Sequence, residues 1–307
     1  MDPEMIKNID RHGPCIYRIN GAHVFPDDVA KITELIRSAI PDARIMLDLP
    51  GNKVRTKFDD GPVTLTKNET FELKSSDVNY PDFWRYLKVG DTLFANDSIY
   101  RLEVVSIADE TVTLLSISDG VLETRKGLHA RGVNEHLPFL FEHDELLIDA
   151  ALEHNVDIIS LSFVRNAEDV RIAKKRIGFP LPGVTIFAKI ETAAALENLG
   201  YIFQEVDVVN IDRGDLSADI GILKIAVTQQ RVIQAALRAK KQIFLATQFL
   251  KNMETQPIPL IAELMGLHEA INSGVSGIQL SEETAVGKFP EECVKLVFDM
   301  YKGSFIG

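Results

Sequence analysis

Polar residues stand at the ends of three apolar runs in the second half of the chain. Lys189 and Glu191 end the first run, Asp215 follows the second, and Thr247 closes the third. Because alternate residues of a strand point the same way, Lys189 and Glu191 share one side. Two carboxylates suit a hard divalent cation such as Mg²⁺. A lysine beside that cation can stabilise charge on a phosphoryl group or an enolate oxygen, so the pattern predicts a metal-dependent site.

The segments that must position these residues show a βα rhythm. From residue 134 onward, short apolar runs rich in β-branched residues alternate with amphipathic segments, which is typical of a parallel sheet covered by helices. Active sites of such barrels lie at the carboxyl ends of the strands, where the polar residues stand. The seven candidate strands are 15–20, 44–49, 158–163, 184–190, 206–212, 242–248 and 277–281. The sequence therefore predicts an α/β fold, a (β/α)8 TIM-type barrel that lacks its first strand.

Residues 57–133 differ from the rest of the chain. Their apolar and polar residues alternate in short runs separated by Gly, Asp and Asn turn signals, which indicates antiparallel strands. We therefore expect a small antiparallel β-barrel lid domain at 57–133, inserted into a barrel that comprises 1–56 and 134–307.

Composition excludes several classes of protein. The chain has 307 residues and a formal net charge of −12, which argues against binding nucleic acid through a basic face. Its only cysteines, Cys15 and Cys293, are too few for a disulfide framework. The sequence contains no long apolar stretch and does not open with a secretion signal. We expect a cytoplasmic protein that needs no membrane, and a homo-oligomer is compatible with the sequence.

Four motifs give a more specific indication. FAKIET, NIDRGDLS, FLATQFL and QLSEETAVGKFP resemble the barrel motifs of the pyruvate kinase family in order and spacing. The resemblance extends upstream to SFVR, YRINGAH and LDLPGNKVRT, and the inserted segment is similar to the family's lid domain. It covers nearly the whole chain.

The resemblance implies a set of roles. It implies phosphoenolpyruvate or pyruvate and ADP or ATP as ligands, and Mg²⁺ or Mn²⁺ held by Glu191 and Asp215. Lys189 and Arg55 would offset charge on the transferred phosphoryl group, and Thr247 would lie where the enol is protonated. The residues implied to bind the substrate are Arg18, Ser162, Phe163, Arg213, Gly214, Asp215 and Thr247. Those implied to face the nucleotide are Asn20, His23, Arg55 and Lys126.

The family's potassium site is changed in this chain. Asn20 and Asp48 match that site, but Ala22 stands where the family has a serine and Lys53 where most members have a glutamate. An ammonium near Asp48 would supply the charge that the ion brings. We therefore expect activity that does not require potassium.

Other departures leave the function open. The first barrel strand with its nucleotide-side loop and the family's carboxyl-terminal regulatory domain are not found, and other family positions differ at Ser217, Leu260, Ile261 and Val286. Three hypotheses follow: a pyruvate-kinase-like phosphotransferase, a specialised relative with another acceptor or with carbon–carbon bond chemistry, and an inactive binding homologue. We also expect Lys189→Met to abolish phosphoryl transfer without disturbing the fold, because Lys189 is read as a strand-end position and not as a core one.

Overall fold

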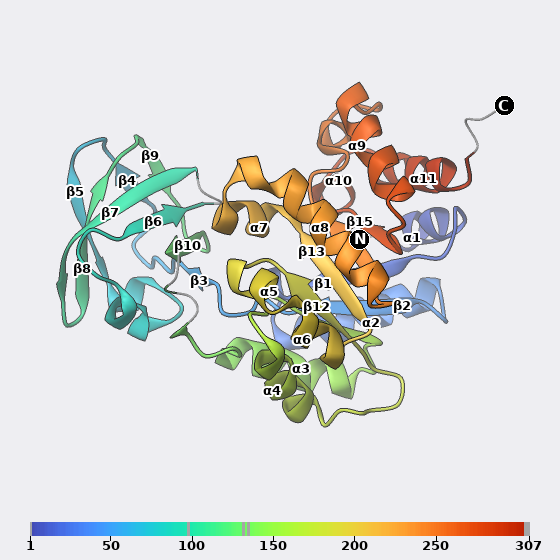
Figure 1. Cartoon of the computed structure of the whole chain (residues 1–307), viewed down its shortest axis with the longest axis horizontal. Coiled ribbons are helices and arrows are strands. Elements are labelled where there is room, and N and C mark those ends of the chain that lie inside the picture. The colour runs from blue at the N-terminus through green and yellow to red at the C-terminus, as the bar shows by residue number, and fades with distance from the viewer. Residues whose placement is uncertain (1, 97–98, 131–132, 134–135, 304–307) are drawn as a thin grey trace. The chain divides into compact units, whose positions relative to one another are not determined.

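The chain divides into two compact units. A computed structural model describes residues 2–96, 99–130, 133 and 136–303. One unit comprises Met1–Gly51 and Leu140–Gly307, and the other comprises Asn52–Phe139 (Figure 1). The expected end of the lid at 133 falls between 131–132 and 134–135, which lie outside the described residues.

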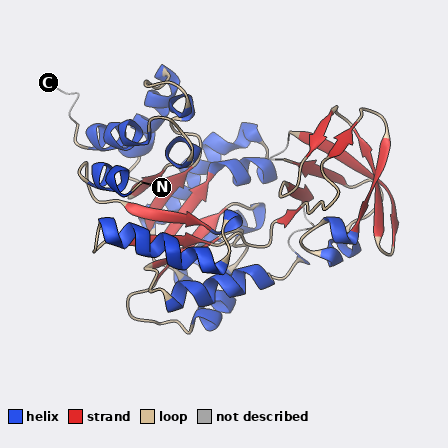
Figure 2. Ribbon diagram, turned by 180° about the vertical axis from the view of Figure 1, so that it is seen from behind, coloured by secondary structure: helices blue, strands red, loops and turns tan. Residues whose placement is uncertain are grey.

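The larger unit is built on a curled parallel sheet. Its strands, in their order across the sheet, are β1 (Ile16–Asn20), β2 (Arg44–Asp48), β11 (Ile158–Leu161), β12 (Thr185–Ile190), β13 (Val208–Asp212), β14 (Gln242–Ala246) and β15 (Gly277–Gln279). Helices lie around these strands (Figure 2). Among the described residues β1 and β15 each pair with one neighbour only. The predicted TIM-type barrel and its seven strands are confirmed.

The helices follow the strands in a βα order. They are α1 (Pro3–Asp10), α2 (Pro26–Ala39), α3 (Glu142–Glu153), α4 (Ala167–Ile177), α5 (Ala193–Glu197), α6 (Leu199–Glu205), α7 (Arg213–Ile220), α8 (Ile225–Arg238), α9 (Ile261–Asn272), α10 (Glu282–Ala285) and α11 (Pro290–Tyr301). Asn198 lies between α5 and α6, and its side-chain amide donates to the carbonyl of Arg165 at 3.3 Å. No helix in the described part of the chain is long and apolar enough to cross a membrane.

The barrel interior has an apolar floor and a charged layer above it. The floor consists of Met46, Ile158, Phe187 and Val208, with Ile16 and Phe244 packed against them. Two residues further along the strands, on the same side, come Arg18, Asp48, Ser160, Lys189, Asn210 and Ala246. The floor anchors the strands by apolar burial, and the next layer brings polar groups together at their carboxyl ends.

The smaller unit is an antiparallel β structure. Its six-stranded sheet has the order β3 (Val54–Arg55), β10 (Gly127–Ala130), β6 (Thr92–Ala95), β7 (Tyr100–Ala108), β8 (Thr111–Ser116) and β5 (Thr70–Lys74). A further pair is formed by β4 (Val63–Leu65) and β9 (Gly120–Leu122). Fully buried Phe83, Trp84, Leu102 and Leu114 give this unit a core of its own.

Candidate active site

Lys189 is the hub of the charged layer. Its Nζ lies 2.8 Å from Glu191 Oε1, 3.2 Å from Asp212 Oδ2 and 3.4 Å from Asp48 Oδ2. It also donates to Ser162 Oγ at 3.2 Å. Lys189 stands at the end of β12 as predicted, but it is only 4% exposed, so the expectation that it is not a core position is wrong. It is buried because Asp48 of β2, Ser162 just after β11 and Asp212 of β13 surround its ammonium.

The electrostatics of this hub are set by burial and by the ion pairs. Burial alone would lower the pKa of Lys189, but Asp48, Glu191 and Asp212 outweigh it and raise that pKa well above its usual value. Burial would likewise raise the pKa of Asp48, but Lys189 and Arg18 lower it. Arg18 donates from Nε to Asp48 Oδ2 at 2.8 Å. Lys189 and Asp48 therefore both remain charged in the folded protein.

Glu191 behaves differently from Asp48. Burial raises the pKa of Glu191 to about 8 even though Lys189 opposes the shift, and the carboxylates of Asp215 and Asp212 add to the rise. One of its oxygens, Oε2, accepts a hydrogen bond from the Phe163 amide at 2.6 Å. The other, Oε1, is buried and lies 2.8 Å from Lys189 Nζ, which donates to it. Glu191 thus has Lys189 as a cationic partner and two carboxylates as neighbours.

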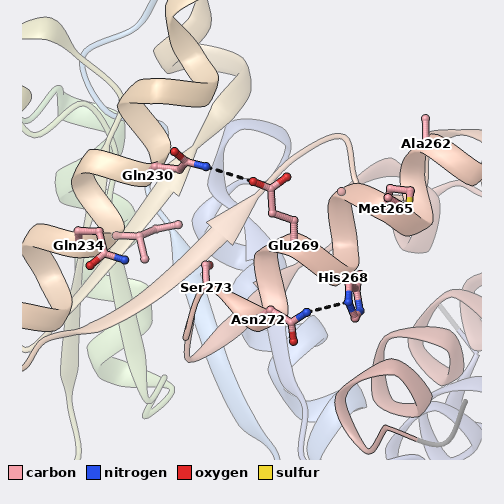
Figure 3. Close-up of a pocket in the computed structure, with 10 residues that line it drawn as sticks. Gln230, Gln234, Ala262, Met265, His268, Glu269, Asn272 and Ser273 are labelled. Carbon is pink, nitrogen blue, oxygen red and sulfur yellow. Dashed lines mark hydrogen bonds between the residues drawn. The ribbon is translucent and has the colours of Figure 1, made fainter. Parts of the chain in front are cut away.

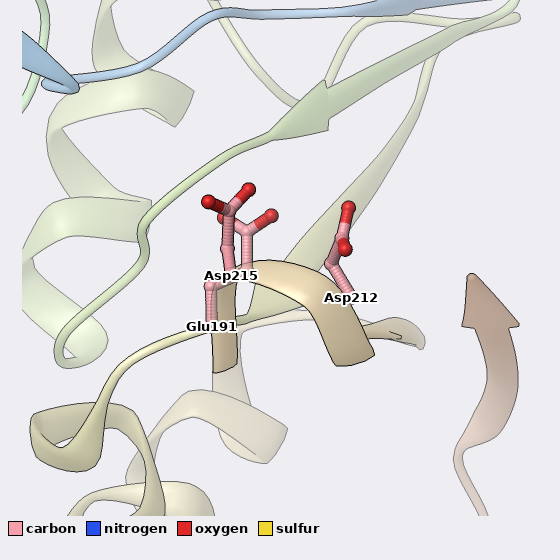
Figure 4. Close-up of side chains that lie close together, drawn as sticks. All are labelled: Glu191, Asp212 and Asp215. Atoms are coloured by element: carbon pink, nitrogen blue, oxygen red, sulfur yellow. The ribbon is translucent and has the colours of Figure 1, made fainter. Parts of the chain in front are cut away.

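Three carboxylates gather at this point. Glu191, Asp212 and Asp215 each offer one oxygen, and these oxygens lie within 4.8 Å of one another. Figure 4 shows Glu191 beside Asp215, with Asp212 at the other side of the first turn of α7. Carboxylate oxygens gathered in this way fit a hard divalent cation such as Mg²⁺. The residues present therefore fit the metal that the sequence predicts.

The start of α7 and the end of β14 form one network. Gly214 N donates to Thr247 Oγ1 at 3.0 Å and to Asp212 Oδ1 at 3.3 Å. Arg213 donates from Nε to the carbonyl of Thr247 at 3.1 Å, and its guanidinium lies 3.8 Å from the ring centroid of Phe249. Burial lowers the pKa of Arg213 to about 10. Arg213 thereby holds the turn that carries Thr247.

Two strand ends have left-handed backbone at residues other than glycine. Phe163 has φ of 54° after β11, and Thr247 and Gln248 have φ of 70° and 55° after β14. Such values are uncommon outside glycine and persist where the surroundings impose them. Here Phe163 is fixed by the bond from its amide to Glu191, and Thr247 by Arg213 and Gly214. Phe163 and Thr247 thus combine left-handed backbone with hydrogen bonds to residues of the site.

The loop after β11 is fixed from outside by a buried ion pair. Arg165 donates from Nε to Asp169 Oδ2 at 2.8 Å and from Nη2 to Asp169 Oδ1 at 2.7 Å. Asp169 is 3% exposed and lies in the first turn of α4, whose first turn is also capped by Asn166. This pair ties the segment of Ser162 and Phe163 to the start of a helix.

The residues predicted to face a nucleotide are distributed over both units. Asn20 Oδ1 accepts from the amide of Ala22 at 3.2 Å, and His23 ends the same short turn of 3₁₀ helix. Lys53, Arg55 and Lys126 belong to the smaller unit and not to the one that carries Lys189. In the barrel unit, the cations that contact Asp48 are Arg18 and Lys189.

Two other polar places lie away from the Lys189 hub. A groove of about 880 Å³ between α8 and α9 is lined by Met265, His268 and Glu269, with Gln230 Nε2 donating to Glu269 at 3.2 Å (Figure 3). A second acidic group is formed by Glu254, Glu282 and Glu283. There Lys251 pairs with Glu254 at 2.6 Å, and Glu283 accepts backbone hydrogen bonds. These contacts indicate that the second acidic group stabilises the fold.

The structure brings most of the predicted site residues together and adds one. Arg18, Ser162, Phe163, Lys189 and Glu191 form one connected cluster with Asp48, and Arg213, Gly214 and Thr247 form another that meets it at Asp212. Sequence reasoning did not assign a role to Asp212. The available signal was its place at the end of a strand, two residues after Asn210 on the same side.

Comparison with known proteins agrees with this architecture. The fold and the site define a TIM-type barrel with a cluster of carboxylates at the carboxyl ends of its strands. The family model "Pyruvate kinase, barrel domain" matches residues 1–294, and the chain belongs to the pyruvate kinase family.

Individual relatives support the same assignment. The chain is 32% identical over 313 residues to a pyruvate kinase of Thermococcus litoralis, covering 97% of this chain and 66% of the relative. It is 31% identical over 319 residues to human "Pyruvate kinase PKLR", covering 95% of this chain and 54% of the relative. It is 30% identical over 295 residues to a pyruvate kinase of Thermoplasma acidophilum, covering 95% and 54%. The chain thus spans between about half and two-thirds of the length of these curated relatives.

Proposed function

We propose that this protein catalyses magnesium-dependent phosphoryl transfer between phosphoenolpyruvate and a nucleoside diphosphate, giving pyruvate. The observation that carries the proposal is the buried ammonium of Lys189, 2.8 Å from Glu191 in a cluster of carboxylates at the strand ends. Phosphoryl transfer depends on positioning and on charge stabilisation, and this cluster provides both. Membership of the pyruvate kinase family supports the same reaction.

The metal would be held by the carboxylates. Glu191 and Asp215 are the proposed ligands, and Mg²⁺ or Mn²⁺ bound there would neutralise charge on substrate oxygens. Phe163 fixes the orientation of Glu191, because its amide donates to Oε2. The apolar floor below this layer keeps bulk water out of the barrel.

Lys189 and Thr247 are assigned the two chemical roles. Lys189 stays protonated, because its carboxylate partners raise its pKa, and its ammonium would offset charge on the transferred phosphoryl group. Thr247 Oγ1 donates to the Ala246 carbonyl at 2.7 Å and accepts from Gly214 N at 3.0 Å. This arrangement holds the hydroxyl at the strand end, where we place protonation of the enol.

The remaining assignments follow the same proposal. Arg18, Ser162, Phe163, Arg213 and Gly214 would surround the pyruvyl group. Asn20, His23, Arg55 and Lys126 would face the nucleotide, and Lys53 with Asn20 and Asp48 would replace the potassium ion. If activity rises manyfold when potassium replaces a bulky organic cation, the role proposed for Lys53 is wrong.

A coupled assay tests the reaction. Phosphoenolpyruvate, ADP and Mg²⁺ are supplied, and pyruvate formation is followed through lactate dehydrogenase. Lys189→Met should lower turnover by about 100-fold or more, as loss of a transition-state donor does. Lys295→Met removes an exposed lysine paired with Asp299 and should leave turnover unchanged.

Three outcomes would count against the proposal. One is the absence of pyruvate formation by the folded wild-type protein. Another is turnover of Lys189→Met close to that of the wild type. The third is exchange of the pyruvate methyl protons without any phosphoryl transfer, which would indicate metal-enolate chemistry with another acceptor.

A further inference from the structure

Asp212 links the carboxylate cluster to the start of α7. Its Oδ2 lies 3.2 Å from Lys189 Nζ, and its Oδ1 accepts from Gly214 N at 3.3 Å. It is 6% exposed and is the N-cap residue of α7, a helix of eight residues. One oxygen of Asp212 thus lies beside the ammonium of Lys189, where a cation could bind. The other accepts from the amide of Gly214, where an anion could bind.

The anion-binding position is the amide of Gly214. A free amide at a helix N-terminus attracts a carboxylate or phosphate ligand. Here that amide already donates to Asp212 and to Thr247. A substrate carboxylate must therefore displace the protein's own carboxylate to use this amide.

The charge of the site leads to the same conclusion. Arg18, Lys189 and Arg213 are cationic side chains of the site, and Asp48 with the three clustered carboxylates opposes them. Without Asp212, the site with a divalent cation bound would be one charge more positive, and it would attract an anionic ligand more strongly.

A second feature concerns Glu191, which belongs to the same cluster. Glu191 is 1% exposed, and its Oε1 lies 2.8 Å from Lys189 Nζ. One oxygen each of Glu191, Asp212 and Asp215 lie within 4.8 Å of one another. Three carboxyl groups this close repel one another, and a divalent cation would relieve that repulsion.

We propose that Asp212 sets the ligand preference of this site, strengthening the binding of a divalent cation and weakening that of a carboxylate ligand at the start of α7. The inference rests on the proposed function, because it concerns the same cluster. It assigns a third carboxylate to the cation and makes Asp212 a specificity-determining residue.

Calorimetric titration tests both parts without measuring activity. The full chain is titrated with Mn²⁺ alone, and the Mn²⁺-saturated protein is then titrated with oxalate. In Asp212→Ala, the affinity for Mn²⁺ should fall by roughly 10- to 100-fold, and the affinity for oxalate should rise by about 10-fold. Asp207→Ala is the matched control, because the Asp207 side chain is 94% exposed, and both affinities should match those of the wild type.

A second variant protects the test against loss of folding. Asp212→Asn keeps an oxygen that can cap α7 but removes the charge. It should weaken Mn²⁺ binding by at least about 5-fold and strengthen oxalate binding, though less than Asp212→Ala does. Unchanged Mn²⁺ affinity or unchanged oxalate affinity in either folded variant overturns the inference, and so does a wild-type protein that binds no Mn²⁺.

The experiments distinguish failure of this inference from failure of the proposed reaction. If the reaction is wrong, the wild-type protein binds Mn²⁺ and forms no pyruvate, and the affinity changes in the Asp212 variants remain. If the inference is wrong, the affinities of the wild type and the variants coincide whether or not pyruvate is formed.

Discussion

Replacing Lys189 by methionine should destabilise the barrel strongly. Methionine fills a similar volume, so the main loss is the ammonium that lies within 3.4 Å of three carboxylates. Arg18 still compensates Asp48, but Glu191 and Asp212 are left buried beside each other. Removing one partner of a buried ion pair typically costs about 3–5 kcal/mol.

The loss of stability expected for Lys189→Met can be narrowed by considering the pKa of Glu191. Burial raises the pKa of Glu191 even with Lys189 in place, and loss of the ammonium would raise that pKa further, so Glu191 can become protonated instead of remaining a buried charge. Protonation relieves part of the repulsion, and we therefore expect a loss near the lower end, about 3 kcal/mol. That is a large fraction of the ~5–15 kcal/mol that stabilises an ordinary domain.

Urea unfolding of the metal-free protein measures this loss. The far-ultraviolet circular dichroism of the helices reports on the barrel unit, because α1 to α11 all belong to it. The fluorescence of Trp84, the only tryptophan, reports on the smaller unit. Mn²⁺ should restore part of the lost stability, because it supplies positive charge to the same carboxylates.

The control is Lys295→Met, which breaks an exposed ion pair with Asp299. This variant should change the free energy of unfolding by less than about 0.5 kcal/mol. A Lys189→Met protein that loses less than about 1 kcal/mol would show that Lys189 does not hold the cluster together.

Three further predictions concern other parts of the barrel. Asp169→Ala removes a carboxylate that Arg165 bonds through two nitrogens, and urea unfolding should show a loss of about 1.5–3 kcal/mol; a loss below about 0.5 kcal/mol would contradict this role. Mn²⁺ at about 100 times its Kd should stabilise the wild type by about 2.7 kcal/mol in a thermal scan, and Asp215→Asn should show less; equal shifts would remove Asp215 from the metal site. Burial raises the pKa of Cys15 to about 11 and that of Cys293 to about 12, so both thiols should react slowly with a disulfide reagent near pH 8 until the protein unfolds. The folded state keeps thiol protons that the unfolded chain releases above about pH 9, so stability should fall as the pH rises from there, and rapid labelling of the native protein would refute the assignment.

The barrel could be predicted because its signals are local. Parallel strands buried on both faces read as short apolar runs, and each of the seven runs overlaps a strand of the sheet. Alternation along β12 is also a local property, and it correctly placed Lys189 and Glu191 on one side. The boundary between α5 and α6 is less local, because Asn198 there bonds the carbonyl of Arg165 in another loop.

The burial of Lys189 could not be predicted, because it depends on contacts distant in sequence. Asp48 is 141 residues away along the chain, and no spacing rule links the two. Nor did the sequence reveal the left-handed backbone at Phe163 and Thr247, since neither residue type favours it. Asp212 was visible as a strand-end carboxylate, but its bond to Gly214 appears only once α7 is seen to begin at the next residue.

The arrangement of the charged layer has a consequence for ligand binding. In the free protein, Lys189 supplies the positive charge that stabilises the carboxylates of Glu191 and Asp212. A divalent cation held by those carboxylates takes over that role, and the ammonium then has fewer anionic partners inside the protein. We therefore expect cation binding to make Lys189 available to an anionic ligand, so that metal and phosphoryl-bearing ligand bind with positive coupling. Asp212 works against that coupling, because its second oxygen keeps the amide of Gly214 engaged.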